Sequence, residues 1–294
     1  MTTVSLNREF KTKIEQINEL PTLPEIARRL LELQMNPNAT SQQLVDIIEN
    51  DPVSSSQVLK YANSAFFNSA RKIESLKDAI NLFGFDNALN CSLSLATAKN
   101  FSIPSDGPIG MHAFWKHAIY SAHLMQILAN KIPEGNGPKP GLAYLAGLLH
   151  NFGYVLLGHA FPNEFNQLNK NLKILNTRDV LPVESNLLGI HHYQLAVWLM
   201  RKWGLPTEIL AAAFEHHNES YRGKHYEYAN LTLVADRILC THGIGDVDND
   251  ELPPRILSSL NIDLIAVQAA TKELLNNKAR IDGLIEGLIN QKRI

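Results

Sequence analysis

Apolar residues in this chain recur at intervals of three and four positions, the spacing that places them on one face of an α-helix. One such stripe is formed by Ile26, Leu30, Leu31 and Leu33. Residues 115–132 carry a longer apolar face, and residues 141–150 are hydrophobic nearly all round, which indicates a buried helix. Strand-like alternation between turn residues is scarce. The spacing therefore predicts an all-α protein of roughly a dozen helices.

Helix starts and breaks divide the chain into blocks. Asp51-Pro52 is typical of a helix start, and Ser75 begins a sequence that resembles a capping box. The first clear break is residues 101–110, which are either a linker or an internal loop. A later break, residues 243–254, is rich in Asp and Gly. We expect two helical blocks followed by short amphipathic helices.

Composition and charge narrow the class of protein. With 45% hydrophobic and 19% charged residues, the 294-residue chain resembles a soluble globular protein. A net charge of −2 without long runs of like charge argues against a sequence-independent nucleic-acid surface and leaves a local basic patch open. No stretch approaches 18 apolar residues, and residues 1–13 lack an apolar signal core. Cys91 and Cys240 lie in apolar stretches, as buried thiols in a reducing compartment do. We expect a cytoplasmic protein and no membrane span.

Familiar catalytic motifs are missing from the sequence. It contains neither of the glycine-rich motifs that cradle phosphates, no Gly-x-Ser-x-Gly nucleophile turn and no Cys-x-x-Cys pair. Chemistry would therefore have to come from the histidines, of which the chain has eleven.

One dipeptide, His150-Asn151, is a single residue away from a metal-binding pair. A histidine followed by an aspartate can hold a divalent cation, and the cation makes a water nucleophilic at neutral pH. Asn151 offers a neutral oxygen in place of a charged one, which weakens the attraction for a dication. The chain thus resembles an enzyme with one altered ligand, and the pair alone leaves open whether it is an enzyme or a binding protein.

Further candidate ligands stand at helix ends or inside apolar helices. They are His117, His150, His192, His216, His217 and Asp236. Such residues can form a metal site between packed helices. A histidine at a helix C-terminus can instead interact with the helix dipole, which alone would explain His150 and His217. Asp236 is different, because a carboxylate in an apolar helix needs a histidine, an arginine or a metal as partner.

Short sequence motifs follow one another along both blocks. They are LPTLP at 20–24, DP at 51–52, NSAFF at 63–67, IES at 73–75, AINLFG at 79–84, FWKH at 114–117, AGLLHNFG at 146–153, GIHH at 189–192, WGLP at 203–206 and EHH at 215–217. As a set they resemble the HDOD domain, a bacterial helical signalling module related to the HD phosphohydrolases. The resemblance covers residues 14–240.

The resemblance implies a multi-helix bundle like that of HD domains, with an N-terminal helical lobe. The N-terminal lobe would span about residues 14–103 and the HD-like lobe about residues 110–240. Residues 241–294 would be a helical C-terminal extension about which the resemblance says little.

The related HD and HD-GYP enzymes hold one or two metals with a His, a His-Asp pair, further histidines and a late Asp. By position, the resemblance assigns these places to His117, His150, Asn151, His192, His216, His217 and Asp236. Two residues depart from the enzymes' pattern: Asn151 replaces the Asp, and Tyr154 replaces a Lys. HDOD members generally regulate through contacts, and both departures agree with that role.

We therefore interpret the chain as a non-catalytic, cytoplasmic signalling or regulatory module that binds a protein partner or a small ligand. No cofactor is required in this interpretation. His117, His150 and Asp236, with Asn151 as a weak fourth ligand, could still hold a single iron, zinc or nickel ion. We expect no membrane and no nucleic acid as partner.

The alternative is an active metal-dependent phosphohydrolase that cleaves a phosphodiester or nucleotide. It requires another carboxylate in place of Asn151, and Glu184 and Glu215 are the nearest candidates in the sequence. Nucleic-acid regulation is a third and weaker interpretation, disfavoured by the near-neutral charge.

Overall fold

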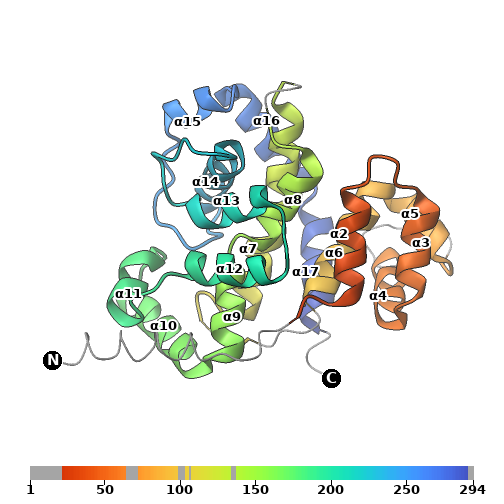
Figure 1. The fold of residues 1–294 in the computed structure, drawn as a ribbon, viewed down its shortest axis with the longest axis horizontal. Helices are drawn as coiled ribbons and strands as arrows, with labels where there is room; N and C mark the ends of the chain where they lie inside the picture. Colours follow the sequence, from red (N-terminus) through yellow and green to blue (C-terminus); the bar gives the residue numbers. More distant parts are fainter. Residues whose placement is uncertain (1–21, 64–71, 99–102, 106, 134–136, 291–294) are drawn as a thin grey trace. The chain divides into compact units, whose positions relative to one another are not determined.

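The computed structural model describes residues 22–63, 72–98, 103–105, 107–133 and 137–290. All regular elements in these residues are helices, with no strand among them, which confirms the predicted fold class (Figure 1). The first residues of the predicted N-terminal lobe, 14–21, lie outside the described residues, as do most of the motif at 63–67 and part of that at 20–24. The chain divides into two compact units.

One unit is formed by residues 22–100 together with residues 275–294. Its helices are α2 (Glu25–Gln34), α3 (Ser41–Glu49), α4 (Pro52–Ala62), α5 (Leu76–Phe83), α6 (Phe85–Ala98) and α17 (Lys278–Asn290). Asp51 caps α4 with Pro52 at its first position, and the Ser75 side chain caps α5, as the sequence predicts. The Tyr61 hydroxyl donates to the carbonyl of Arg280, which ties α17 to α4 across more than 200 residues of sequence.

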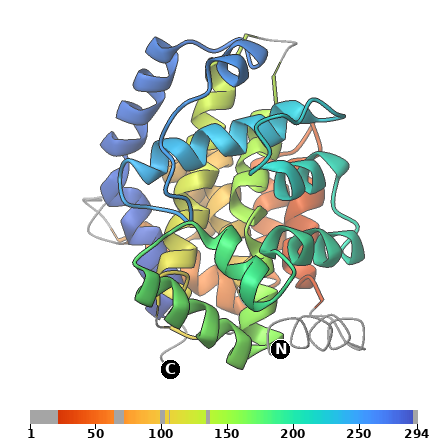
Figure 2. The ribbon, with the colours of Figure 1, turned by 90° about the vertical axis from the view of Figure 1, so that its left-hand side faces the viewer.

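The other unit contains residues 101–274 among those described, and it carries the histidine-rich segments. Its helices are α7 (Met111–Lys131), α8 (Pro140–Leu149), α9 (Phe152–Ala160), α10 (Pro162–Leu175), α11 (Val180–Leu187), α12 (His192–Lys202), α13 (Thr207–Glu215), α14 (Tyr226–Cys240), α15 (Pro254–Ser259) and α16 (Leu264–Asn276). In Figure 2, α14 (light blue) crosses α7 (yellow to yellow-green), and the two helices are in contact.

Close approach between helices in this unit depends on two glycines. A Cβ on Gly147 of α8 would lie 2.7 Å from the backbone of Ser121 in α7. A Cβ on Gly153 of α9 would lie 1.8 Å from the carbonyl oxygen of His192, at the start of α12. Real side chains do not come this close, so both contacts exist because the residue has no side chain. The second contact places α12 directly against the His150-Asn151 pair.

Among the described residues, one apolar stretch is long enough to cross a membrane. Residues 140–160 pass this test by length and composition, yet 89% of the apolar window is buried inside the structure. The stretch is two helices, α8 and α9, that meet at His150-Asn151. Both helices are buried almost all round, as the apolar composition of residues 141–150 predicts.

Candidate metal centre

The structure brings all seven predicted site residues together. They are His117 of α7, His150 and Asn151 between α8 and α9, His192 of α12, His216 and His217 after α13, and Asp236 of α14. All except His217 are at most 5% exposed. Ligand atoms of six of these residues, all except Asn151, form two groups, and within each group they lie within 4.8 Å of one another.

The first group consists of His117, His150 and Asp236. Nε2 of His117 lies 3.0 Å from Oδ1 of Asp236, and Nε2 of His150 lies 3.6 Å from the same oxygen. The buried Asp236 thus has the imidazole partners that its place in an apolar helix requires.

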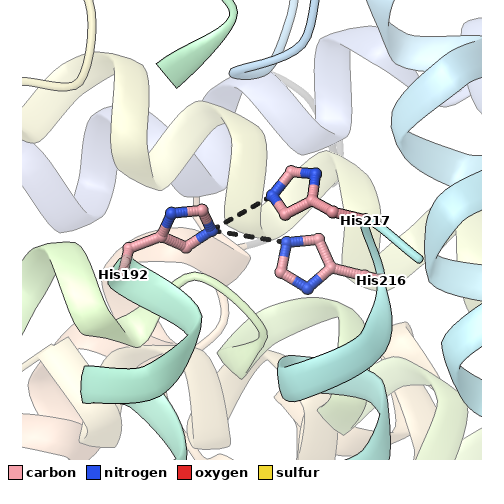
Figure 3. A group of neighbouring side chains, drawn as sticks. All are labelled: His192, His216 and His217. Atoms are coloured by element: carbon pink, nitrogen blue, oxygen red, sulfur yellow. Dashed lines mark hydrogen bonds between the residues drawn. The ribbon is translucent and has the colours of Figure 1, made fainter. Parts of the chain in front are cut away.

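The second group consists of His192, His216 and His217 (Figure 3). Nε2 of His192 lies 3.4 Å from Nε2 of His216 and 3.3 Å from Nε2 of His217. Three ring nitrogens that converge in this way can share a proton in pairs or jointly face a cation.

Contacts behind the rings decide which nitrogen carries the proton. Nδ1 of His150 donates to the carbonyl of Gly147 at 2.8 Å, and Nδ1 of His216 donates to the carbonyl of Ala213 at 2.9 Å. Nδ1 of His192 lies 3.1 Å from both oxygens of Glu184. Since the outer nitrogen is the donor in each case, the neutral form of each ring faces the site with the lone pair of Nε2. Metal-binding histidines are oriented by the same kind of contact.

Asp246 is a site residue that the sequence did not identify. Its Oδ2 accepts hydrogen bonds from Nδ2 of Asn151 at 3.0 Å and from the Tyr154 hydroxyl at 2.9 Å. The carboxylate also lies 3.9 Å from Nδ1 of His117 and 4.0 Å from Nε2 of His192. Its one signal in the sequence was its place in an Asp- and Gly-rich break, which is typical of any surface loop.

The two carboxylates considered as replacements for an aspartate at position 151 lie elsewhere. Glu184 is fully buried behind His192, where it orients that ring. Glu215 accepts a hydrogen bond from the Asn218 side chain in an exposed contact. Asp246, by contrast, touches Asn151 directly.

Four buried side-chain atoms of this cluster have no hydrogen-bond partner among the described residues. They are Nε2 of His150, Oδ1 of Asn151, Oδ2 of Asp236 and Oδ1 of Asp246. Each of them is a hydrogen-bond acceptor. Buried acceptors without donors are costly, and a cation is the partner that satisfies several at once. The donor set therefore fits a metal ion.

The protonation state of His216 and His217 also suits a cation, whereas the neighbouring carboxylates raise the pKa of His117 and His192 against the effect of burial. Burial lowers the pKa of His216 well below its ordinary value and lowers that of His217 to about 4. These rings are neutral at pH 7, the form in which imidazole binds metals. Burial alone would raise the pKa of Asp246, but the neighbouring histidines, His117 and His192 first among them, hold this pKa below its ordinary value. The Asp246 carboxylate therefore remains ionised.

Two small cavities reach the cluster. One has a volume of about 260 Å³ and is lined by His117, Asn151, Tyr154 and Asp246 among others. The other has a volume of about 280 Å³ and is lined by His216, His217 and Asp236 among others. A larger cavity of about 750 Å³, lined by Glu219, Arg237 and Arg255 among others, has none of these histidines in its wall.

Comparison with known proteins identifies the family of the chain and shows that its helical fold recurs in solved structures. The HDOD domain family model matches residues 20–219. One similar crystal structure is that of a protein from Marinobacter aquaeolei VT8 that is provisionally assigned to signal transduction. Its sequence is 33% identical and its TM-score is 0.85, and the match covers 98% of this chain and 66% of that one. An HDOD domain protein of unknown function from Geobacter sulfurreducens is 23% identical with a TM-score of 0.75, over 98% of both chains.

A provisionally assigned phosphohydrolase from Shewanella amazonensis SB2B shares the fold at 20% identity. Its TM-score is 0.70, over 94% of this chain and 97% of that one. The chain spans less than half the length of the curated relatives it matches, 47% and 42%.

Proposed function

Because the chain belongs to the HDOD domain family, as its motifs predict, we propose that it is a non-catalytic signalling module that holds a divalent metal in its histidine-rich unit. It acts in the cytoplasm by binding a protein partner or a small ligand, with neither membrane nor nucleic acid as partner. The observation that carries the metal is the set of four buried acceptors without donors. The fold itself is one that signalling proteins share with HD-like hydrolases.

The residues that would hold the ion are those of the two groups. His117, His150 and Asp236 form one group, and His192, His216 and His217 form the other. Mixed imidazole and carboxylate donors favour iron, zinc or nickel over calcium or magnesium, which prefer oxygen. When bound, such an ion acts as a Lewis acid and neutralises the buried carboxylates.

The arrangement around Asn151 favours binding over turnover. The Asp246 carboxylate is held there by hydrogen bonds from the Asn151 amide and the Tyr154 hydroxyl. At the two positions where the enzymes' pattern has an Asp and a Lys, this chain has the neutral side chains of Asn151 and Tyr154.

The second candidate function is a metal-dependent phosphohydrolase. The observation in its favour is Asp246, because it places a carboxylate beside the position where Asn151 removed one. In that case the 243–250 segment would have to move aside to admit a phosphodiester.

Metal analysis and a hydrolysis assay on the same preparation separate the two functions. The natural protein, purified without chelator, should contain a divalent ion that His150→Ala abolishes. It should not hydrolyse bis(p-nitrophenyl) phosphate or a nucleotide above background with added Zn²⁺, Ni²⁺ or Fe²⁺. His159→Ala, which removes an exposed histidine of α9, is the matched control. Hydrolysis that depends on His150 would establish the hydrolase, and absence of metal after loading would refute the metal centre.

A further inference from the structure

We infer that Asp246 is a metal ligand, which restores from a distant loop the carboxylate missing at Asn151 and joins the two histidine groups into one centre. This inference rests on the proposed metal binding. It assigns a ligand that lies 95 residues along the chain from the residue it compensates for.

Asp246 lies between the two groups. Its Oδ1 is 3.9 Å from Nδ1 of His117, in the first group, and its Oδ2 is 4.0 Å from Nε2 of His192, in the second. No other carboxylate of the described residues approaches a histidine of each group to within 4 Å. One carboxylate with an oxygen toward each group is the arrangement that lets a single side chain serve both.

The unused bonding capacity of Asp246 points the same way. Oδ2 accepts from Asn151 and Tyr154, while Oδ1 has no donor among the described residues. The residue is 3% exposed, so that oxygen needs a partner inside the protein, either a water held in the adjoining cavity or a cation. An ionised oxygen left bare in the protein interior is costly, and a cation removes the cost.

The backbone before Asp246 has a conformation that directs this residue toward the cluster. Gly245 has φ +114° and Gly243 has φ +71°, conformations that side chains other than glycine rarely adopt. A Cβ on Gly245 would be 3.4 Å from Nε2 of His117, so the loop passes directly against that ring. The Cys240 thiol donates to the carbonyl of Val247 at 3.3 Å, which fixes the residue after Asp246 as well.

Hydrogen bonds of Asp248 also fix the segment on the other side of Asp246. The Asp248 carboxylate accepts from the Thr177 hydroxyl at 2.5 Å and from the backbone amides of Arg178 and Asp179. Asp246 is therefore presented by a loop held on both sides of it, as a ligand must be if the protein is to determine its geometry.

The test exchanges the two side chains. Binding of Zn²⁺ and Ni²⁺ is measured for the natural protein and for three variants: Asp246→Asn, Asn151→Asp and the double variant. Calorimetric titration gives the affinity, and metal content after gel filtration gives the amount bound. Asp250→Asn is the matched control, because it removes the same charge from an exposed position of the same loop. Far-ultraviolet circular dichroism verifies that each variant is folded.

We expect Asp246→Asn to lower metal affinity about tenfold or more, and the double variant to recover most of the loss. Asn151→Asp alone should gain much less affinity than it gains in the Asp246→Asn background, because the carboxylate is already present. Asp250→Asn should bind as the natural protein does.

Three results would overturn the inference. Equal affinity of Asp246→Asn and the natural protein would show that Asp246 is not a ligand, while the metal centre itself would stand. Additive effects of the two exchanges would show that Asp246 does not stand in for the missing carboxylate. If Asp246→Asn alone does not fold, a folded double variant that binds metal far more weakly than the natural protein would overturn the inference instead. A natural protein that takes up no metal would refute the proposed function and this inference with it.

Discussion

The Glu184 carboxylate lies directly behind the His192 ring, with both of its oxygens 3.1 Å from Nδ1. Burial alone would raise the pKa of Glu184, but the charge of His192 and hydrogen bonds from His191 and His192 hold this pKa below its ordinary value. Because Glu184 faces Nδ1, it holds a proton there, and in the neutral form of His192 the Nε2 lone pair is directed toward His216 and His217.

Replacing Glu184 with Gln should therefore weaken metal binding without removing a ligand. The neutral amide still accepts a hydrogen bond from Nδ1, but it no longer increases the basicity of the ring. We expect a loss of affinity of about tenfold, since contacts of this kind are typically worth 10- to 100-fold. Competition with a chromophoric chelator measures it. Glu49→Gln, an exposed change on α3, is the control, and equal losses in both variants would contradict the orienting role.

Metal removal should destabilise the histidine-rich unit, because the cluster keeps four unsatisfied buried acceptors without an ion. A ligand at 100 times its Kd stabilises the folded state by about 2.7 kcal/mol. For a unit of this size, that corresponds to a rise in Tm of roughly 5 to 10 °C. Scanning calorimetry of chelated and reloaded protein measures the shift. A Tm that does not respond to Zn²⁺, Ni²⁺ or Fe²⁺ would argue that the histidines form a purely structural network.

Much of the fold could be predicted because the relevant signals are local. Apolar spacing predicted the helices, and Asp51 and Ser75 predicted two of their starts. The cluster was predictable in part for the same reason. Asp236 stood out because an apolar helix cannot bury a carboxylate alone, and His117 and His150 indeed lie beside it.

Asp246 could not be predicted because no local rule places it. Its position depends on two glycines with positive φ, on the thiol of Cys240 and on the anchor at Asp248. Each of these is common in loops that have no function. The role of Glu184 was equally hidden, because its partner His192 follows only after the turn that ends α11.

Close packing at Gly153 should be indispensable to the site. Gly153→Ala puts a Cβ onto the carbonyl oxygen of His192, a clash with backbone that no rotamer relieves. We expect a loss of about 3 kcal/mol or more in the free energy of unfolding, together with loss of metal binding. Gly287→Ala is the contrasting control, because nothing lies within 4 Å of its added Cβ in α17.

Urea denaturation distinguishes these two glycine substitutions. Alanine in a helix loses less backbone entropy on folding than glycine, so Gly287→Ala should raise stability by about 0.5 to 1 kcal/mol. A Gly153→Ala protein as stable as the natural one would mean that α9 and α12 can separate at no cost, and the close approach of His192 to the His150-Asn151 pair would then not be required.

The anchor at Asp248 should make the loop that carries Asp246 sensitive to acid. Burial alone would raise the pKa of Asp248, but hydrogen bonds from Thr177 and from the amides of Arg178 and Asp179 hold this pKa below its ordinary value of 3.8. The lowered pKa means that the unfolded chain takes up a proton first. The stabilisation is therefore complete above the unfolded pKa and is lost as pH falls through the folded one.

Asp248→Asn reports this contribution directly. At pH 7 it should lower stability by about 1 kcal/mol, a modest figure because the carboxylate is exposed and solvent screens its charge. The difference from the natural protein should stay constant down to about pH 5 and narrow below about pH 4, where the natural carboxylate also becomes neutral. Urea denaturation of metal-free protein at several pH values measures it. A difference that grows on acidification would reverse the sign and contradict the anchoring role of Asp248.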